Sequence, residues 1–159
     1  MIMPILEKDL STARTAWGNG LLEISKSFET EGIEMARKVA GNMLDTLYGF
    51  DLGQVLFKPT LSGGSQTFRP TKEGALSYYT GQNSAYPNDV GFGVMFWREF
   101  NSNTSAIFID DTVAMWMGSF TLIDRDGRVT KVDKSYGYKL DDFGNLRIML
   151  HHSSLPYEL

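Results

Sequence analysis

The chain ends in an apolar run that leads into two adjacent histidines and two serines: LRIMLHHSSLPY, residues 146–157. Successive side chains of a β-strand point to opposite faces, so odd-numbered residues share one face and even-numbered residues the other. His151 and Ser153 are therefore expected on one face, and His152 and Ser154 on the other, together with Ile148. One face should meet the core or a cavity. From the residues alone, the stretch either packs the fold as its final strand or carries chemistry.

A period-two pattern of apolar and polar residues precedes this stretch and predicts a meander of strands. Five runs are read as strands, over residues 94–101, 105–109, 113–123, 130–138 and 146–153, and they predict a meander of four or five strands. The later connections, at residues 110–111, 124–127 and 141–145, are rich in aspartate and, in the last two, glycine. Short polar connections of this kind are typical of hairpins, so neighbouring strands are expected to be antiparallel.

Apolar residues at spacings of three and four predict two helices in the first third of the chain, over residues 7–30 and from 33 to about 48. A short β-rich run follows at residues 55–60. Thr71, directly after Pro70, is expected to cap a short third helix. Helices followed by a meander indicate an α+β fold: a cone-shaped, curved antiparallel sheet wrapped around N-terminal helices, in a single domain over residues 1–159.

Composition narrows the classes of function. The chain has 159 residues, a net charge of -4 and no basic patch, which argues against a nucleic-acid partner. No apolar run approaches the roughly 18 residues that span a membrane, and the start lacks the apolar core of a signal peptide. The absence of cysteine excludes disulfides, thiolate nucleophiles and cysteine-based zinc sites, and it fits a reducing compartment. A cytoplasmic protein with no membrane partner is expected.

The two histidines also limit metal chemistry. A catalytic zinc ion usually takes three protein ligands from histidine, cysteine and carboxylate. His151 and His152 point to opposite faces of a strand, so they do not readily bind one ion together. Three-histidine sites and sites containing cysteine are excluded within one chain. A carboxylate site for manganese or magnesium stays open, although most of the 19 acidic residues lie in predicted turns or helices.

The residues HHSSLP, at 151–156, resemble the signature that ends the iota-class carbonic anhydrases. Further stretches agree with this family in the same order: KPT at 58–60, FRPT at 68–71, GALSYY at 74–79 and DKSYGY at 133–138. The resemblance spans residues 14–157. It implies the cone-shaped fold of the nuclear transport factor two-like (cystatin-like) superfamily. The iota-class enzymes belong to a group that is similar to the association domain of calcium/calmodulin-dependent protein kinase II. The resemblance also implies a homodimer and the reversible hydration of carbon dioxide to bicarbonate.

The resemblance further implies the residues of the site. Iota-class members that work without metal bind bicarbonate through a threonine, a tyrosine and a serine, and these fall on Thr60, Tyr78 and Ser153. Tyr79 and Ser154 are neighbours that leave the last two assignments open by one residue, and Ser154 is included among the expected substrate-binding residues. No cofactor is expected, while manganese and zinc stay open because the resemblance also extends to members that use them.

Hydration of carbon dioxide without a metal needs side chains that hold the attacking water and donate to the oxygens that gain negative charge. Hydroxyls suit both tasks because each can donate and accept a hydrogen bond. Thr60 and Ser153 are expected to hold the water and a bicarbonate oxygen, and Tyr78 to donate to the developing oxyanion. His151 shares the face of Ser153 and is expected to relay the proton. If the pocket lies on the other face, the even-numbered histidine and serine take these roles.

Two other interpretations stay open at this point. The first is a non-catalytic small-ligand-binding or oligomerisation module, because a fold does not fix a function; an interior filled with aromatic side chains would favour it. The second is an isomerase or cyclase that acts on a larger hydrophobic molecule, a chemistry that usually needs a buried carboxylate base. Asp133 lies within a predicted strand, and a large apolar pocket around its side chain would favour this second interpretation.

Overall fold

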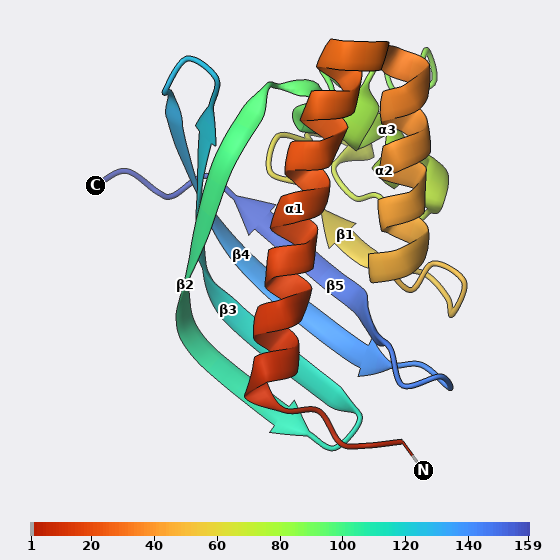
Figure 1. Cartoon of the computed structure of the whole chain (residues 1–159), viewed down its shortest axis with the longest axis vertical. Helices are drawn as coiled ribbons and strands as arrows, with labels where there is room; N and C mark the ends of the chain where they lie inside the picture. The colour runs from red at the N-terminus through yellow and green to blue at the C-terminus, as the bar shows by residue number, and fades with distance from the viewer. Residues whose placement is uncertain (1) are drawn as a thin grey trace.

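The computed structural model describes residues 2–159 (Figure 1). Helices occupy the first half of the chain and four long strands the second half. The elements are α1 (Glu7–Glu31), α2 (Ile33–Leu47), β1 (Leu56–Lys58), the 3-10 turn η1 (Gly64–Gln66), α3 (Lys72–Thr80), the 3-10 turn η2 (Phe92–Val94), β2 (Trp97–Asp110), β3 (Val113–Asp124), β4 (Val129–Leu140) and β5 (Leu146–Ser154). The predicted helices and the short strand are present, and the Thr71 hydroxyl accepts a hydrogen bond from the Gly74 amide at the start of α3.

One five-stranded sheet has the order β1-β5-β4-β3-β2. Strands β2 to β5 form the antiparallel meander that the hairpin turns predict. The short strand β1 pairs with β5 in parallel, so the sheet is mixed rather than wholly antiparallel as expected. In this pairing Phe57 lies opposite His151 and Lys58 opposite His152. This parallel pairing therefore places the segment that follows Lys58 next to the end of β5.

The first two predicted strands, over residues 94–101 and 105–109, form a single strand, so the meander has four strands, the lower of the two expected numbers. β2 runs without a break from Trp97 to Asp110 and pairs with β3 along its length. The polar run at residues 101–105 looks like a loop in the sequence, but it contains a β-bulge between Thr104 and Ala106. A bulge of this kind bends its strand and increases the local twist, which helps the sheet to curve.

A second bulge changes the expected faces of β5. Tyr136 lies opposite His151 and Tyr138 lies opposite Ile148, so one extra residue of β5, Met149, falls between these pairs. Paired residues share a face, which places Ile148 on the same face as His151, against the prediction from simple alternation. Ile148 consequently joins the buried core.

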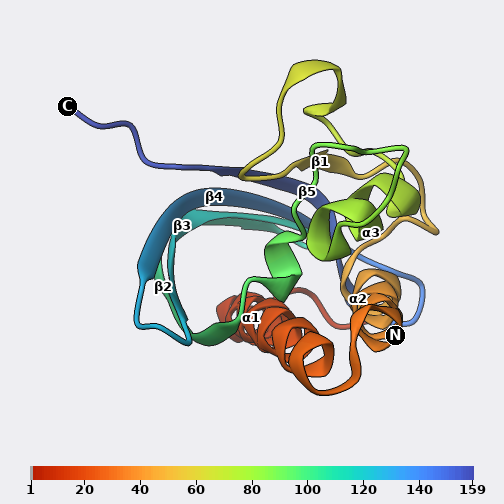
Figure 2. The ribbon, with the colours of Figure 1, turned by 90° about the horizontal axis from the view of Figure 1, so that it is seen from above.

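The sheet curves around the helices, and α1 lies across its concave face (Figure 2). Trp17, Leu21 and Ile24 lie on the buried side of α1, because helical residues three and four apart share a face. Gly18 lets α1 approach the sheet, since a Cβ at this position would overlap the ring of Phe100. Aromatic side chains fill much of the space between α1 and the sheet. This arrangement confirms the predicted α+β cone.

Candidate active site

The end of β5 presents one histidine and one serine to the interior of the cone. His151 and Ser153 are each only 1% exposed. His152 is exposed and Ser154 half-buried on the outer face of the sheet. Ser154 therefore does not line the cavity that Ser153 faces, because adjacent residues of this regular part of the strand point in opposite directions.

Thr60 reaches the same place from the other side of the β1–β5 pairing. Its Oγ1 lies 2.6 Å from Oγ of Ser153, and either hydroxyl can donate in this hydrogen bond. The Lys58 amine donates to the Ser153 carbonyl oxygen at 2.9 Å, which further joins the two segments. Two hydroxyls that are 93 positions apart in the sequence thus form one buried pair.

Tyr78, on α3, lines the same cavity as this hydroxyl pair. Its hydroxyl oxygen accepts a hydrogen bond from the Leu61 amide at 3.1 Å, which leaves its own proton free to donate. Tyr79 also points inward, but its hydroxyl bonds to Tyr48 and Trp17 instead. The structure therefore brings Tyr78, rather than Tyr79, next to Thr60.

The cavity enclosed by these residues is small and tight. The gaps between its side chains are too narrow to admit a water molecule. Its walls are formed by ten residues: Trp17, Phe57, Pro59, Thr60, Tyr78, Tyr79, Phe92, Lys134, His151 and Ser153. A substrate of a few atoms must therefore displace the mutual hydrogen bond of Thr60 and Ser153 to bind both hydroxyls.

Lys134 is a residue of this site that the sequence analysis did not find. Its side chain is 3% exposed, and its Nζ lies 2.9 Å from Nε2 of His151 and 3.1 Å from Oγ of Ser153. Nζ also lies 4.3 Å from the ring centroid of Trp17. The available signal was the period-two pattern of β4, in which Lys134 alternates in phase with Val132 and Tyr136.

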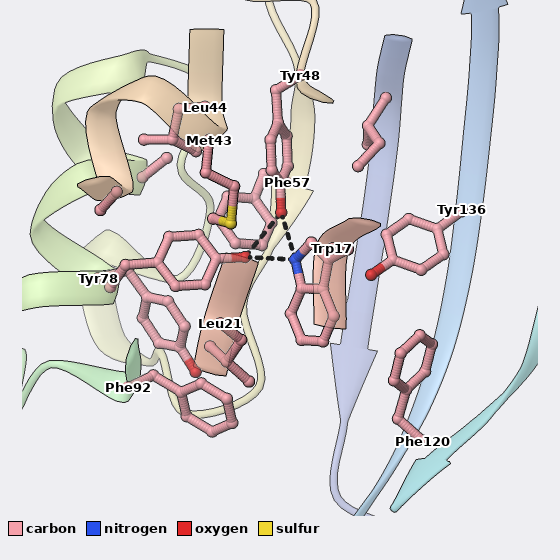
Figure 3. Close-up of a cluster of buried hydrophobic side chains, with 14 of the residues drawn as sticks. Trp17, Leu21, Met43, Leu44, Tyr48, Phe57, Tyr78, Phe92, Phe120 and Tyr136 are labelled. Atoms are coloured by element: carbon pink, nitrogen blue, oxygen red, sulfur yellow. Dashed lines mark hydrogen bonds between the residues drawn. The ribbon is translucent and has the colours of Figure 1, made fainter. Parts of the chain in front are cut away.

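A cluster of aromatic residues packs around the imidazole of His151 and fixes its position. The Tyr48 hydroxyl lies 2.8 Å from Nδ1 of His151 and 2.7 Å from the Tyr79 hydroxyl. The indole N–H of Trp17 donates to both tyrosine hydroxyls at 3.1 Å, and Figure 3 shows its bond to Tyr48 among the buried side chains. The ring of Phe57 stacks on the imidazole with centroids 4.8 Å apart. Both ring nitrogens of His151 are thus occupied and the ring is fixed.

The hydrogen bonds form one continuous chain from Thr60 through Ser153, Lys134, His151 and Tyr48. Each group except a protonated lysine can both donate and accept. In one arrangement Lys134 donates to Nε2 while Nδ1–H donates to Tyr48. In the other, Tyr48 donates to Nδ1 while Nε2–H donates to a neutral lysine nitrogen. A proton can therefore be exchanged along the chain without breaking it.

Burial favours the uncharged forms of the groups in this chain of hydrogen bonds. Desolvation lowers the pKa of Lys134 well below its usual value. A cation–π contact with Trp17 would stabilise a protonated Lys134 by roughly 2 kcal/mol. This is less than the several kcal/mol that burial of an isolated charge costs. Desolvation, followed by the nearby Lys134 and His152, also lowers the pKa of His151 well below its usual value. Burial raises the pKa of Tyr78, so its phenol stays protonated. Burial in this site therefore favours the neutral amine, the neutral imidazole and the protonated phenol.

Metal ligands are not gathered in this part of the molecule. Across residues 2–159, no group of three or more histidine, aspartate or glutamate side chains is arranged to hold a metal ion. His151 and His152 lie on opposite faces, as predicted. Asp133 is exposed on the outer face, so it does not supply the buried carboxylate of an isomerase or cyclase.

In the same described range, no helix is both long and apolar enough to cross a lipid bilayer.

Solved structures support the fold class first. A calcium/calmodulin dependent protein kinase II association domain from Xanthomonas campestris has a TM-score of 0.61 and 17% identity, covering 100% of this chain and 97% of that chain. At this identity the similarity concerns the fold alone. The chain therefore belongs to the class of α+β proteins with this cone-shaped fold.

Closer relatives identify the family. The family model described as metal-independent carbonic anhydrase matches residues 8–155. A metal-independent carbonic anhydrase of Nostoc sp. (strain PCC 7120) is 43% identical over 154 residues, which cover 97% of this chain and 75% of the relative. The crystal structure of a cyanobacterial iota-carbonic anhydrase complexed with bicarbonate is 42% identical, with a TM-score of 0.98 over 100% of this chain and 97% of that chain. The chain belongs to the metal-independent carbonic anhydrase family, which confirms the resemblance found in its sequence.

The neutral state of Lys134 predicts a pH dependence of stability. The unfolded chain protonates this amine below a pKa of about 10.4, whereas the folded protein keeps it neutral to a much lower pH. Between the two pKa values the unfolded state binds more protons, so the free energy of unfolding rises with pH by up to about 1.4 kcal/mol per unit. Urea unfolding at several pH values between about 7.5 and 9.5, below the ordinary tyrosine pKa, measures this slope.

Lys134→Met is expected to remove the slope, so its stability relative to the wild-type protein is greatest at the lower end of this range. Lys131→Met, which changes an exposed lysine of the same strand, serves as the control and should leave the slope in place. Equal slopes in the wild-type protein and Lys134→Met would show that the buried amine is protonated in the folded state.

Proposed function

We propose that this chain interconverts carbon dioxide and bicarbonate without a metal ion, at the cavity lined by Thr60, Tyr78, Lys134, His151 and Ser153. The observation that carries the proposal is the pair of hydroxyls at 2.6 Å, with a buried amine within 3.1 Å of Ser153. A family whose model is described as metal-independent, and a relative of 42% identity solved with bicarbonate, support the same assignment.

The attacking water is held by Thr60 and Ser153 in this proposal. Each hydroxyl exchanges its bond to the other for a bond to the water or to a substrate oxygen. As the water attacks the carbon, its proton passes through the Ser153 hydroxyl to the neutral amine of Lys134. The new ammonium lies beside the new bicarbonate anion, so the two charges stabilise each other where the local dielectric constant is low.

His151 assists this transfer through Lys134. Its Nε2 lies 2.9 Å from the amine, whereas its other nitrogen is held by Tyr48. The imidazole therefore shares the proton that the amine receives, rather than taking it from the water directly. Tyr78 acts on the opposite charge: its free hydroxyl proton donates to the oxygen of carbon dioxide that becomes negative.

The alternative functions fit these residues less well. Aromatic side chains do fill much of the cone interior, as a non-catalytic module would allow. Such a module does not need a buried lysine without an acidic partner, because an uncompensated buried amine costs stability. The cavity also has no carboxylate in its lining, whereas an isomerase or cyclase usually needs a buried carboxylate base.

Removal of metals tests the reaction directly. Stopped-flow measurement of carbon dioxide hydration with a pH indicator, on protein treated with a strong chelator and checked for residual metal, is expected to give an unchanged kcat/KM. Activity that disappears and returns on addition of manganese or zinc alone would contradict the proposal for this site while preserving the reaction.

Loss of either hydroxyl is expected to reduce turnover sharply. Ser153→Ala and Thr60→Val should each lower kcat/KM by about 10²–10³, the usual effect of removing one preorganised donor. Tyr78→Phe should lower it by a similar factor at almost constant volume. Stopped-flow kinetics and thermal unfolding of the same samples separate lost chemistry from lost folding.

Ser154→Ala is the matched control for Ser153→Ala, because it removes the same hydroxyl one residue away on the outer face. It is expected to retain wild-type kcat/KM. If Ser154→Ala were the damaging change and Ser153→Ala harmless, the site would lie on the other side of the sheet.

A homodimer in the cytoplasm forms part of the same proposal. Residues 2–159 include no helix over the outer face of the sheet (Figure 2). Phe108 and Met115 lie opposite each other on this face and are both exposed, as is Met117. Exposed apolar patches of this kind often mark a protein–protein contact. The cytoplasmic location rests on composition, since a chain without cysteine needs no oxidising compartment.

Sedimentation equilibrium is expected to give twice the chain mass of 17.8 kDa. Met117→Lys should shift the protein towards the monomer, because it places a charge at the centre of the proposed contact. Leu52→Lys, at an exposed apolar residue in the loop before β1, should leave the mass unchanged. A wild-type monomer at micromolar concentration would rule out the dimer.

A further inference from the structure

The amine of Lys134 has an unusual combination of neighbours. It is almost fully buried, and among residues 2–159 no carboxylate forms an ion pair with it. Its polar contacts are Nε2 of His151 and Oγ of Ser153. When both of these atoms accept its two N–H groups, the lone pair of a neutral amine has no hydrogen-bond partner. A free nucleophile therefore lies in the wall of the cavity.

Carbon dioxide is an electrophile that neutral amines attack and ammonium ions do not. An unperturbed lysine is neutral in only about one molecule in a thousand at pH 7.5. Desolvation lowers the pKa of Lys134 well below that of an exposed lysine, which raises the fraction of neutral amine. The same group also stands at the place where the proposed function brings its substrate, so the two reactants meet at high effective concentration.

We propose that Lys134 is a carbamylation site, at which its Nζ reversibly attacks the carbon of carbon dioxide held in the cavity. A bond forms between nitrogen and carbon, and one C=O bond becomes a C–O⁻ single bond. The proton that leaves the nitrogen passes to Nε2 of His151, 2.9 Å away. The products are a carbamate anion and an imidazolium cation, so charge and atoms balance. The inference rests on the proposed function in one respect: carbon dioxide must enter this cavity.

The cavity that suits bicarbonate also suits this product. A carbamate differs from bicarbonate by an N–H in place of the hydroxyl, and it is equally planar and negative. Thr60 and Ser153 can donate to its oxygens as they would to bicarbonate. The adjacent imidazolium compensates its charge, which offsets the cost of a buried anion.

Carbamylation would occupy the space of the substrate and remove the base. Lys134 cannot accept the proton of water while its nitrogen carries the carboxylate. The modification is therefore a self-limiting reaction: it lowers the active fraction of the protein at high carbon dioxide and reverses when carbon dioxide is removed.

Carbon-13 nuclear magnetic resonance of protein labelled with ¹⁵N at the lysine side chains, in ¹³C-labelled carbon dioxide and bicarbonate, tests this modification. The expected result is a carbamate carbon signal split by one-bond coupling to ¹⁵N, which disappears in Lys134→Met. Lys131→Met and Lys58→Met should retain the signal; Lys58 is the other amine close to the hydroxyl pair.

Trapping localises the carbamate without any variant. Rapid alkylation of the carbamate with a trialkyloxonium salt at alkaline pH, followed by peptide mass spectrometry, should place the label on Lys134 at ten or more times the level of Lys131 and Lys139. Label spread equally over the lysines, or no ¹⁵N-coupled signal, would overturn the inference.

Hydration kinetics of the same wild-type sample separate the two proposals. Turnover without a Lys134 carbamate would refute carbamylation and leave the proposed function intact. A Lys134 carbamate without turnover would support carbamylation and refute the function.

Discussion

Parallel pairing of β1 with β5 holds the two parts of the site together. Three residues of β1 pair with the end of β5, and the chain then turns at Pro59 to place Thr60 beside Ser153. The Arg69 amide donates to the Phe57 carbonyl oxygen at 2.8 Å on the other side of β1, so this short strand is bonded along both edges. A three-residue strand has little stability of its own, and its position depends on these neighbours. The distance between the two hydroxyls is therefore a property of the sheet rather than of a local loop.

Behind the hydroxyls, the aromatic interior determines the electrical character of the site. Trp17, Tyr48, Phe57 and Tyr136 surround His151, which is almost fully buried. Polar groups in such surroundings must bond to one another, and the chain from Thr60 to Tyr48 gives each of its members at least one hydrogen bond. Lys134 is the one member that would normally carry charge, and no carboxylate in the described chain pairs with it. The same burial that lowers the pKa of Lys134 favours its neutral amine, the form that the proposed mechanism uses as a base.

Strand alternation predicted the faces of His151 and Ser153 because β5 is regular from Leu150 onwards. It failed at Ile148, since the bulge at Met149 depends on the pairing with β4, which a single strand does not reveal. Thr60 and Tyr78 were found only through the family resemblance, because their approach to Ser153 depends on long-range pairing. Lys134 was missed because a lysine in a strand usually faces water. Lys134 alternates in phase with the buried residues Val132 and Tyr136, and this pattern was the one indication in the sequence that its side chain faces the core.

An uncharged resting site has consequences for a reversible reaction. Hydration turns two neutral reactants into an anion and a proton, and the dehydration direction consumes both. If Lys134 holds the proton, the neutral site is ready for carbon dioxide and water, whereas the protonated site is ready for bicarbonate. Each direction thus begins from the protonation state that the other direction leaves behind, and the resting amine selects neutral carbon dioxide over the anion. The low dielectric constant that disfavours an isolated ammonium also strengthens its attraction to an adjacent bicarbonate, so the buried amine and its anion are stable together when neither is stable alone.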